Sequence, residues 1–131
     1  MTTPAAHPSP RRRLLTLGPA ALAGLASGCT AISLAAHARR YCDAGAGPGG
    51  LMELNFTLLP LAVAFAVIAL FVACLLEQQP VVLQLGTVLF VLAVLTVMYF
   101  AVRGTLGGYP GDLAKCGPDN VPPWWPRWLP A

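Results

Sequence analysis

Two apolar segments joined by four residues constrain this 131-residue chain more than any other feature. Residues 56–76 and 81–102 contain no Asp, Glu, Lys, Arg or His, and only residues 77–80 lie between them. An α-helix rises about 1.5 Å per residue, so each segment can cross the roughly 30 Å hydrocarbon core of a bilayer. So short a connection makes the two helices antiparallel neighbours. The sequence therefore predicts a transmembrane helical hairpin over residues 56–102.

The composition of the chain agrees with a membrane location. Hydrophobic residues make up 56% of it and charged residues only 10%, against roughly 25% charged residues in soluble domains. So few charges argue against a disordered chain and against a soluble globular enzyme. The basic residues do not alternate with aromatic ones, so we predict no nucleic-acid partner. Seven of the eight cations are arginines, a usage typical of bacteria with GC-rich genomes.

A weaker apolar segment covers residues 14–36 and follows three arginines at residues 11–13. It is long enough to cross a bilayer, although alanine and glycine dilute its leucines. We favour a retained transmembrane helix, because the apolar core of a cleaved signal is usually only about 7–15 residues long. Two alternatives stay open, namely signal cleavage at the A-x-A sequence of residues 36–38 and lipoprotein processing with acylation of Cys29.

Polar segments separate and flank these helices. Residues 1–13 are predicted to form a disordered basic N-terminus, residues 37–54 a glycine-rich polar loop, and residues 103–131 an irregular tail rich in tryptophan and proline. The predicted fold class is therefore an all-α membrane protein with three transmembrane helices, which are the hairpin and the weaker N-terminal helix.

The orientation depends on whether the first segment spans the membrane. With three spans and a cytoplasmic N-terminus, the loop 37–54 and the tail 103–131 are extracytoplasmic and hold five of the eight cations. The positive-inside rule disfavours this arrangement, because it expects lysine and arginine on the cytoplasmic side. In the alternative, only the hairpin spans the membrane and every cation is cytoplasmic. We favour the three-helix topology in the cell membrane because of the tail and the cysteines.

The four cysteines are of two kinds. Cys42 and Cys116 lie in polar segments, 14 residues before and 14 residues after the hairpin, and so on the same side of the membrane. The chain is long enough to bring them together, and outside the cytoplasm we expect a disulfide. Free thiols and a redox-active or metal-binding pair are the alternatives. Cys29 and Cys74 lie within spans at different depths, so we expect them to be unpaired and buried.

Small residues recur at helical spacing in the first two predicted helices. The first helix has Gly24 and Gly28, in a segment where this spacing also arises by chance. The second helix has one alanine stripe, formed by Ala62, Ala66, Ala69 and Ala73. Small residues on one face let helix backbones approach closely. We favour packing of the alanine stripe against the third helix, and the alternative is contact with another copy or another membrane protein.

The tail is the most distinctive polar segment, because it holds all three tryptophans of the protein. Trp124, Trp125 and Trp128, together with Arg127, have side chains suited to the headgroup region of a bilayer. The four prolines among residues 122–130 disfavour a helix here. We therefore expect the tail to lie on the membrane surface, and the alternative is a rigid recognition segment for a partner protein.

No group of side chains in the sequence points to catalysis. We find no paired carboxylates, nucleophile–base pair or glycine-rich phosphate loop, so we predict a protein that is not an enzyme and has no cofactor or metal site. The hairpin also lacks the charged groups at membrane depth that transport usually needs. We expect a structural, accessory or assembly partner of a cell-envelope complex. The alternatives are a small subunit of an oligomeric transporter or channel, and a lipoprotein or exported protein with a two-helix membrane hairpin.

Overall fold

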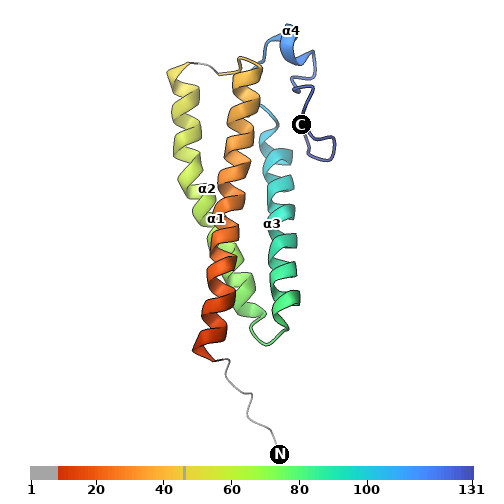
Figure 1. Cartoon of the computed structure of the whole chain (residues 1–131). Coiled ribbons are helices and arrows are strands. Elements are labelled where there is room, and N and C mark those ends of the chain that lie inside the picture. The colour runs from red at the N-terminus through yellow and green to blue at the C-terminus, as the bar shows by residue number, and fades with distance from the viewer. Residues whose placement is uncertain (1–8, 46) are drawn as a thin grey trace, which may run out of the picture.

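The computed structural model describes residues 9–45 and 47–131. These residues form three long helices and one short helix, and none of them is in a β-strand. The helices are α1 (Pro10–Tyr41), α2 (Pro48–Leu75), α3 (Val81–Arg103) and α4 (Leu113–Cys116). Helices α1, α2 and α3 are long and apolar enough to cross a membrane, which confirms the predicted fold class. They lie side by side, while α4 and the tail lie beyond the end of α3 and beside the upper part of α1 (Figure 1).

Helix α1 begins within the segment predicted to be disordered. Pro10 takes the first helical position, where its missing amide hydrogen costs little. The Ser9 hydroxyl caps the helix by accepting a hydrogen bond from the Arg12 amide at 3.4 Å. The prediction of disorder is therefore wrong for residues 10–13, and residues 1–8 lie outside the described part of the chain.

The polar loop predicted over residues 37–54 is much shorter in the structure. Helix α1 continues to Tyr41 and α2 already begins at Pro48, so only the residues between them form the connection. Glycine and polar residues lower the intrinsic helix propensity of this segment. The segment is nevertheless helical on both sides of the connection, and the tail contacts it through the hydrogen bond from the Asp112 amide to the Cys42 carbonyl at 2.7 Å.

Helices α1 and α2 meet where almost no side chain separates their backbones. A Cβ atom added to Gly24 would lie 2.5 Å from the Ala66 Cα, and one added to Gly28 would lie 2.6 Å from the Ala62 Cα. Only glycine permits so close an approach. The prediction that the alanine stripe packs against the third helix is therefore wrong for Ala62 and Ala66. They face α1, because α1 supplies the glycines that close packing requires.

The rest of the alanine stripe does lie beside α3. Ala69 and Ala73 are buried in one cluster with Val88 and Leu92 of α3. The buried Gln84 side chain donates a hydrogen bond from its Nε2 to the Ala73 carbonyl at 2.6 Å. That carbonyl is among the last four of α2, which have no helical amide as partner. Gln84 therefore caps the end of α2 and fixes the hairpin.

The outward faces of α2 and α3 consist mainly of large apolar side chains. Phe56, Val63 and Phe71 are exposed on α2, and Val82 and Phe90 are exposed on α3. Water would penalise so large an apolar surface, whereas lipid tails solvate it. Helix α1 is the least hydrophobic of the three long helices. The two helices of the hairpin thus have the surface expected of membrane spans.

Candidate functional site

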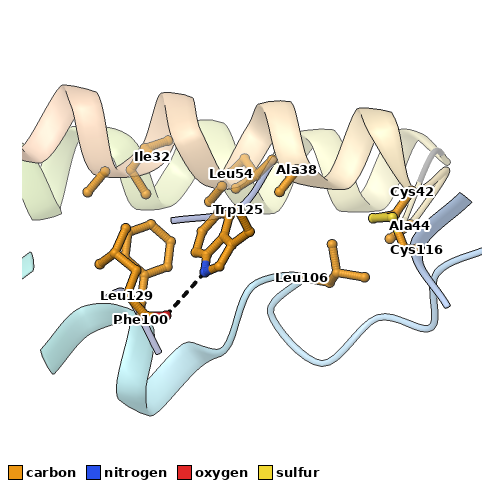
Figure 2. Close-up of a cluster of buried hydrophobic side chains, with 12 residues drawn as sticks. Ile32, Ala38, Cys42, Ala44, Leu54, Phe100, Leu106, Cys116, Trp125 and Leu129 are labelled. Atoms are coloured by element: carbon orange, nitrogen blue, oxygen red, sulfur yellow. Dashed lines mark hydrogen bonds between the residues drawn. A yellow bond between two sulfur atoms is a disulfide. The ribbon is translucent and has the colours of Figure 1, made fainter. Parts of the chain in front are cut away.

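The residues beyond the helix ends form a cap, defined here as residues 104–131 together with the connection between α1 and α2. Cys42 at the end of α1 is bonded to Cys116 of α4, with a Cα–Cα distance of 5.6 Å, so the predicted disulfide is present (Figure 2). Asp112 fixes the start of α4, because its carboxylate accepts a hydrogen bond from the Ala114 amide at 2.9 Å. The disulfide thereby joins the tail to the first helix.

A charged cluster connects the three long helices to the cap. It consists of Arg39 of α1, Glu53 of α2, Arg103 of α3 and Tyr109 of the cap. The Glu53 carboxylate lies 3.5 Å from Nη1 of Arg39 and also forms an ion pair with Arg103. The same carboxylate accepts a hydrogen bond from the Tyr109 hydroxyl at 2.9 Å. Two arginines share one carboxylate, so the cluster keeps a net positive charge.

Arg39 is the buried member of the charged cluster, with only 5% of its side chain exposed. Its guanidinium carbon lies 4.8 Å from the centroid of the Tyr109 ring, which is a cation–π geometry. Its Nη1 also donates a hydrogen bond to the Gly50 carbonyl at 3.5 Å. Gly107 has a positive φ of 64°, and a Cβ atom there would collide with the guanidinium. The cap and α2 therefore bury almost all of the Arg39 side chain.

Hydrogen bonds in the cap shift two pKa values. The hydrogen bond to the Glu53 carboxylate raises the pKa of Tyr109, because an ionised tyrosine could not donate it. The Asp43 carboxylate beside Lys115 raises the pKa of that lysine, since it stabilises the charged ammonium. At neutral pH, Tyr109 is therefore a neutral donor and Lys115 is a cation.

The charged cluster is not predicted from the sequence as a whole, although two of its residues stand in a recognisable pattern. Glu53 lies just before the second apolar segment and Arg103 just after the third. Since a hairpin brings these two positions to the same side of the membrane, an ion pair between them could be predicted. No pattern in the sequence predicts the burial of Arg39, because this burial depends on how the cap folds over α1.

Trp125 lies in the core of the cap. It is buried, and its ring meets Phe100 of α3 edge-on at 5.1 Å between centroids. Its Nε1 donates a hydrogen bond to the Leu129 carbonyl at 3.3 Å (Figure 2). The prediction that Trp125 contacts the headgroup region or a partner is therefore wrong. The cap needs an apolar anchor on the helix ends, and this indole provides it.

The remaining predicted residues of the tail lie on its surface. Trp124 is partly exposed, and its ring centroid lies 4.9 Å from that of His37 and 6.1 Å from that of Tyr41. Arg127 and Trp128 are exposed, Trp128 to 72%. Contact of these side chains with lipid headgroups or with a partner stays a prediction.

An apolar crevice of about 350 Å³ lies between α1, α3 and the tail. Its walls include Ala26 and Thr30 of α1, Thr96 of α3, and Trp128 and Leu129 of the tail. Few polar atoms line this crevice, so its chemistry suits an apolar side chain or a lipid tail better than a polar substrate.

Cys29 and Cys74 are free, as predicted, but both are exposed instead of buried. A thiol is apolar enough to face lipid, so a position inside a helix does not require it to be buried in the protein. Within residues 9–45 and 47–131, no three His, Cys, Asp or Glu side chains are grouped so that they could hold a metal ion.

The polar groups of the cap mainly bind one another. The disulfide, the charged cluster and Trp125 each join the tail to at least one long helix. This geometry holds the helix ends together. No model of a protein family matches this chain, and neither the curated proteins nor the solved structures give a match.

Proposed function

We propose that the chain is a non-enzymatic structural or assembly subunit of a larger complex in the cell membrane. The observation that carries this proposal is the outward face of α1 between residues 26 and 33. Its exposed side chains are small or weakly polar, namely Ala26, Cys29, Thr30 and Ser33. They differ from the large apolar side chains that α2 and α3 expose to lipid.

Such a face suits a second helix better than it suits lipid. Lipid tails solvate leucine and phenylalanine well, whereas small residues allow close packing of helix backbones. The crevice of about 350 Å³ adjoins this face and would receive a large side chain of the partner. Trp128 lines the crevice and is 72% exposed, as expected of an aromatic anchor. These features together support a partner helix seated between α1 and the tail.

In the alternative of an oligomeric transporter or channel subunit, copies of the chain would associate through the glycine pair and the alanine stripe. Gly24 and Gly28 contact α2 of the same chain, and all four alanines of the stripe are buried. A second copy could reach these residues only if the helices separated. The partner surface that we propose is therefore the outward face of α1.

The packing of α1 supports its retention in the mature protein. Cleavage at residues 36–38 would remove α1 from the bundle and expose the alanine stripe, and Ala38 is fully buried at 0% exposure. Lipoprotein processing before Cys29 would remove Gly24 and Gly28, which form the closest contact with α2. Both alternatives would therefore dismantle the helix packing.

The disulfide supports an extracytoplasmic cap and a cytoplasmic N-terminus. Disulfides persist in oxidising compartments and are rare in the cytosol. The positive-inside rule favours the opposite placement of the cations in the cap. We give the disulfide more weight, because a reducing cytosol would break the bond between Cys42 and Cys116.

Site-specific photo-crosslinking in native membranes tests the proposed partner surface. A benzophenone side chain at Thr30 should give one discrete adduct heavier than the chain, because that position faces the partner. The same group at Val67, which is exposed on α2, is the matched control and should give lipid adducts only. Replacing Ala26 by Phe should abolish the Thr30 adduct, whereas Val67→Phe should leave it unchanged.

The masses of the adducts distinguish the alternatives. An adduct at Thr30 with twice the mass of the chain would show that the partner is a second copy of this protein, and would overturn the proposal of a different partner. Lipid adducts alone at both positions would overturn the proposal of a partner helix. An adduct that survives Ala26→Phe would show that the partner does not pack on the outward face of α1.

A further inference from the structure

A groove between α1 and α2 holds two adjoining cavities near the cap. Their volumes are about 210 Å³ and 260 Å³, and both are lined by Ala36, Arg40 and Leu54. The first cavity extends toward the cap along Arg39 and Asp43. The second extends into the membrane region along two apolar and two polar side chains, namely Ile32, Leu58, Ser33 and Asn55.

The cap end of this groove has an excess of positive charge. Arg40 is exposed and forms no ion pair within the part of the chain that the structure describes. Arg39 beside it shares the Glu53 carboxylate with Arg103, so that cluster is also positive. Asp43 is the acidic residue of the groove, and the Lys115 ammonium pairs with it.

The groove changes from polar to apolar at the depth where the membrane spans begin. Arg40 lies one helical turn beyond the apolar segment that ends at residue 36, and Asn55 immediately precedes the segment that starts at residue 56. Ile32 is two turns deeper than Arg40, or about 12 Å at 1.5 Å per residue. A phospholipid has the same order, with a charged phosphate at the surface and an acyl chain below it.

We infer that this groove binds one anionic phospholipid, with its phosphate at Arg40 and one acyl chain along Ile32, Leu54 and Leu58. The charge complementarity argues for an anionic lipid, because a guanidinium donates charge-assisted hydrogen bonds to phosphate oxygens. The amide of Asn55 supplies a further hydrogen-bonding group at the boundary between headgroup and acyl chain. The groove meets the proposed partner surface at Ser33, whereas Arg40, Leu54 and Leu58 line the groove and not the crevice beside α3 and the tail.

Native mass spectrometry of the full chain in mild detergent tests this lipid site. Phosphatidylglycerol and phosphatidylcholine with identical acyl chains are the probes. The wild-type chain should retain one phosphatidylglycerol in preference to phosphatidylcholine. Arg40→Gln should weaken retention of phosphatidylglycerol about tenfold, which is the effect of one charge-assisted hydrogen bond. Arg11→Gln is the matched control, because it removes the same charge from the opposite end of α1 and should change nothing.

A second variant separates the acyl-chain part of the groove from the phosphate part. Leu58→Trp should fill the second cavity and weaken retention of both lipids, whereas Arg40→Gln should remove only the preference for phosphatidylglycerol. Formation of the disulfide checks that Arg40→Gln is folded. If this folded variant still preferred phosphatidylglycerol over phosphatidylcholine as the wild type does, the inference would be overturned. Displacement of bound phosphatidylglycerol by millimolar inorganic phosphate, as effective as displacement by added phosphatidylglycerol, would also overturn the inference. The acyl chain would then play no part in binding.

Discussion

The two ends of the helix bundle are held together in different ways. At the cap end, a disulfide, a buried arginine and a buried tryptophan join the tail to the three long helices. At the other end, Arg13 pairs with Glu77 at 3.1 Å and Arg12 donates a hydrogen bond to the Gln79 carbonyl at 2.6 Å, and both contacts are exposed. Exposed pairs contribute little to stability, whereas a disulfide and a buried aromatic side chain contribute much. The cap end is therefore the more firmly held end, and the other end depends on helix packing and on the buried hydrogen bond of Gln84 to Ala73.

The largest expected effect comes from removing the disulfide. Replacing Cys42 and Cys116 together by alanine should lower the free energy of unfolding by about 4 kcal/mol, because the bond closes a long loop in the unfolded chain. Unfolding by SDS in mixed micelles, followed by circular dichroism, measures this loss. The variant that replaces Cys29 and Cys74 by alanine is the control and should keep wild-type stability, since these thiols are free. Equal stability of both variants would show that the cap does not depend on its disulfide.

The second-largest loss of stability is expected on removal of the Trp125 side chain, because this indole is the apolar anchor of the cap. Trp125→Ala should destabilise the cap by about 3 kcal/mol, since it leaves a cavity against Phe100. Hydrogen exchange of the amides of α4 should then become on the order of 100-fold faster. Trp128→Ala should leave these exchange rates unchanged, because Trp128 is exposed. Similar rates in the two variants would contradict the assignment of Trp125 to the cap core.

The acidic residues at the two ends provide a matched pair of variants. Glu53→Gln should cost about 2 kcal/mol, because it leaves the buried Arg39 without its carboxylate while Glu53 itself is partly exposed. Glu77→Gln should cost less than about 1 kcal/mol, because it breaks one exposed pair. Thermal unfolding of both variants in the same detergent makes the comparison. A larger loss for Glu77→Gln would reverse the ranking of the two ends.

The smallest effect belongs to the exposed pair of Lys115 with Asp43. The folded-state pKa of Lys115 is raised above its ordinary value of 10.5, so the pair stabilises the fold below that pH and is lost as the pH rises through the raised pKa. The thermal midpoint of the wild type should therefore fall slightly more than that of Lys115→Gln in this alkaline range. At neutral pH the two midpoints should agree within about 2 °C, as expected for an exposed pair. A wild-type midpoint that rises relative to that of Lys115→Gln across the same alkaline range would contradict this sign.

The sequence predicted the features that depend on hydrophobic length and on the side of the membrane. The hairpin and the pairing of Cys42 with Cys116 both follow from those two constraints. It did not predict the features that depend on tertiary packing. The burial of Arg39 and Trp125 needs the folded cap, and the partner of Ala66 needs the glycine on the facing helix. The local composition of the cap predicts an irregular segment, but contacts with residues distant in the sequence hold the cap in place.

The position of the disulfide sets an order of events during biogenesis. Both α2 and α3 lie between Cys42 and Cys116, which are 74 residues apart. The two thiols meet on one side of the membrane only after both helices have been inserted and the tail has followed them to that side. Oxidation must therefore be a late step in maturation, because the bond can close only after both helices and the tail have been made.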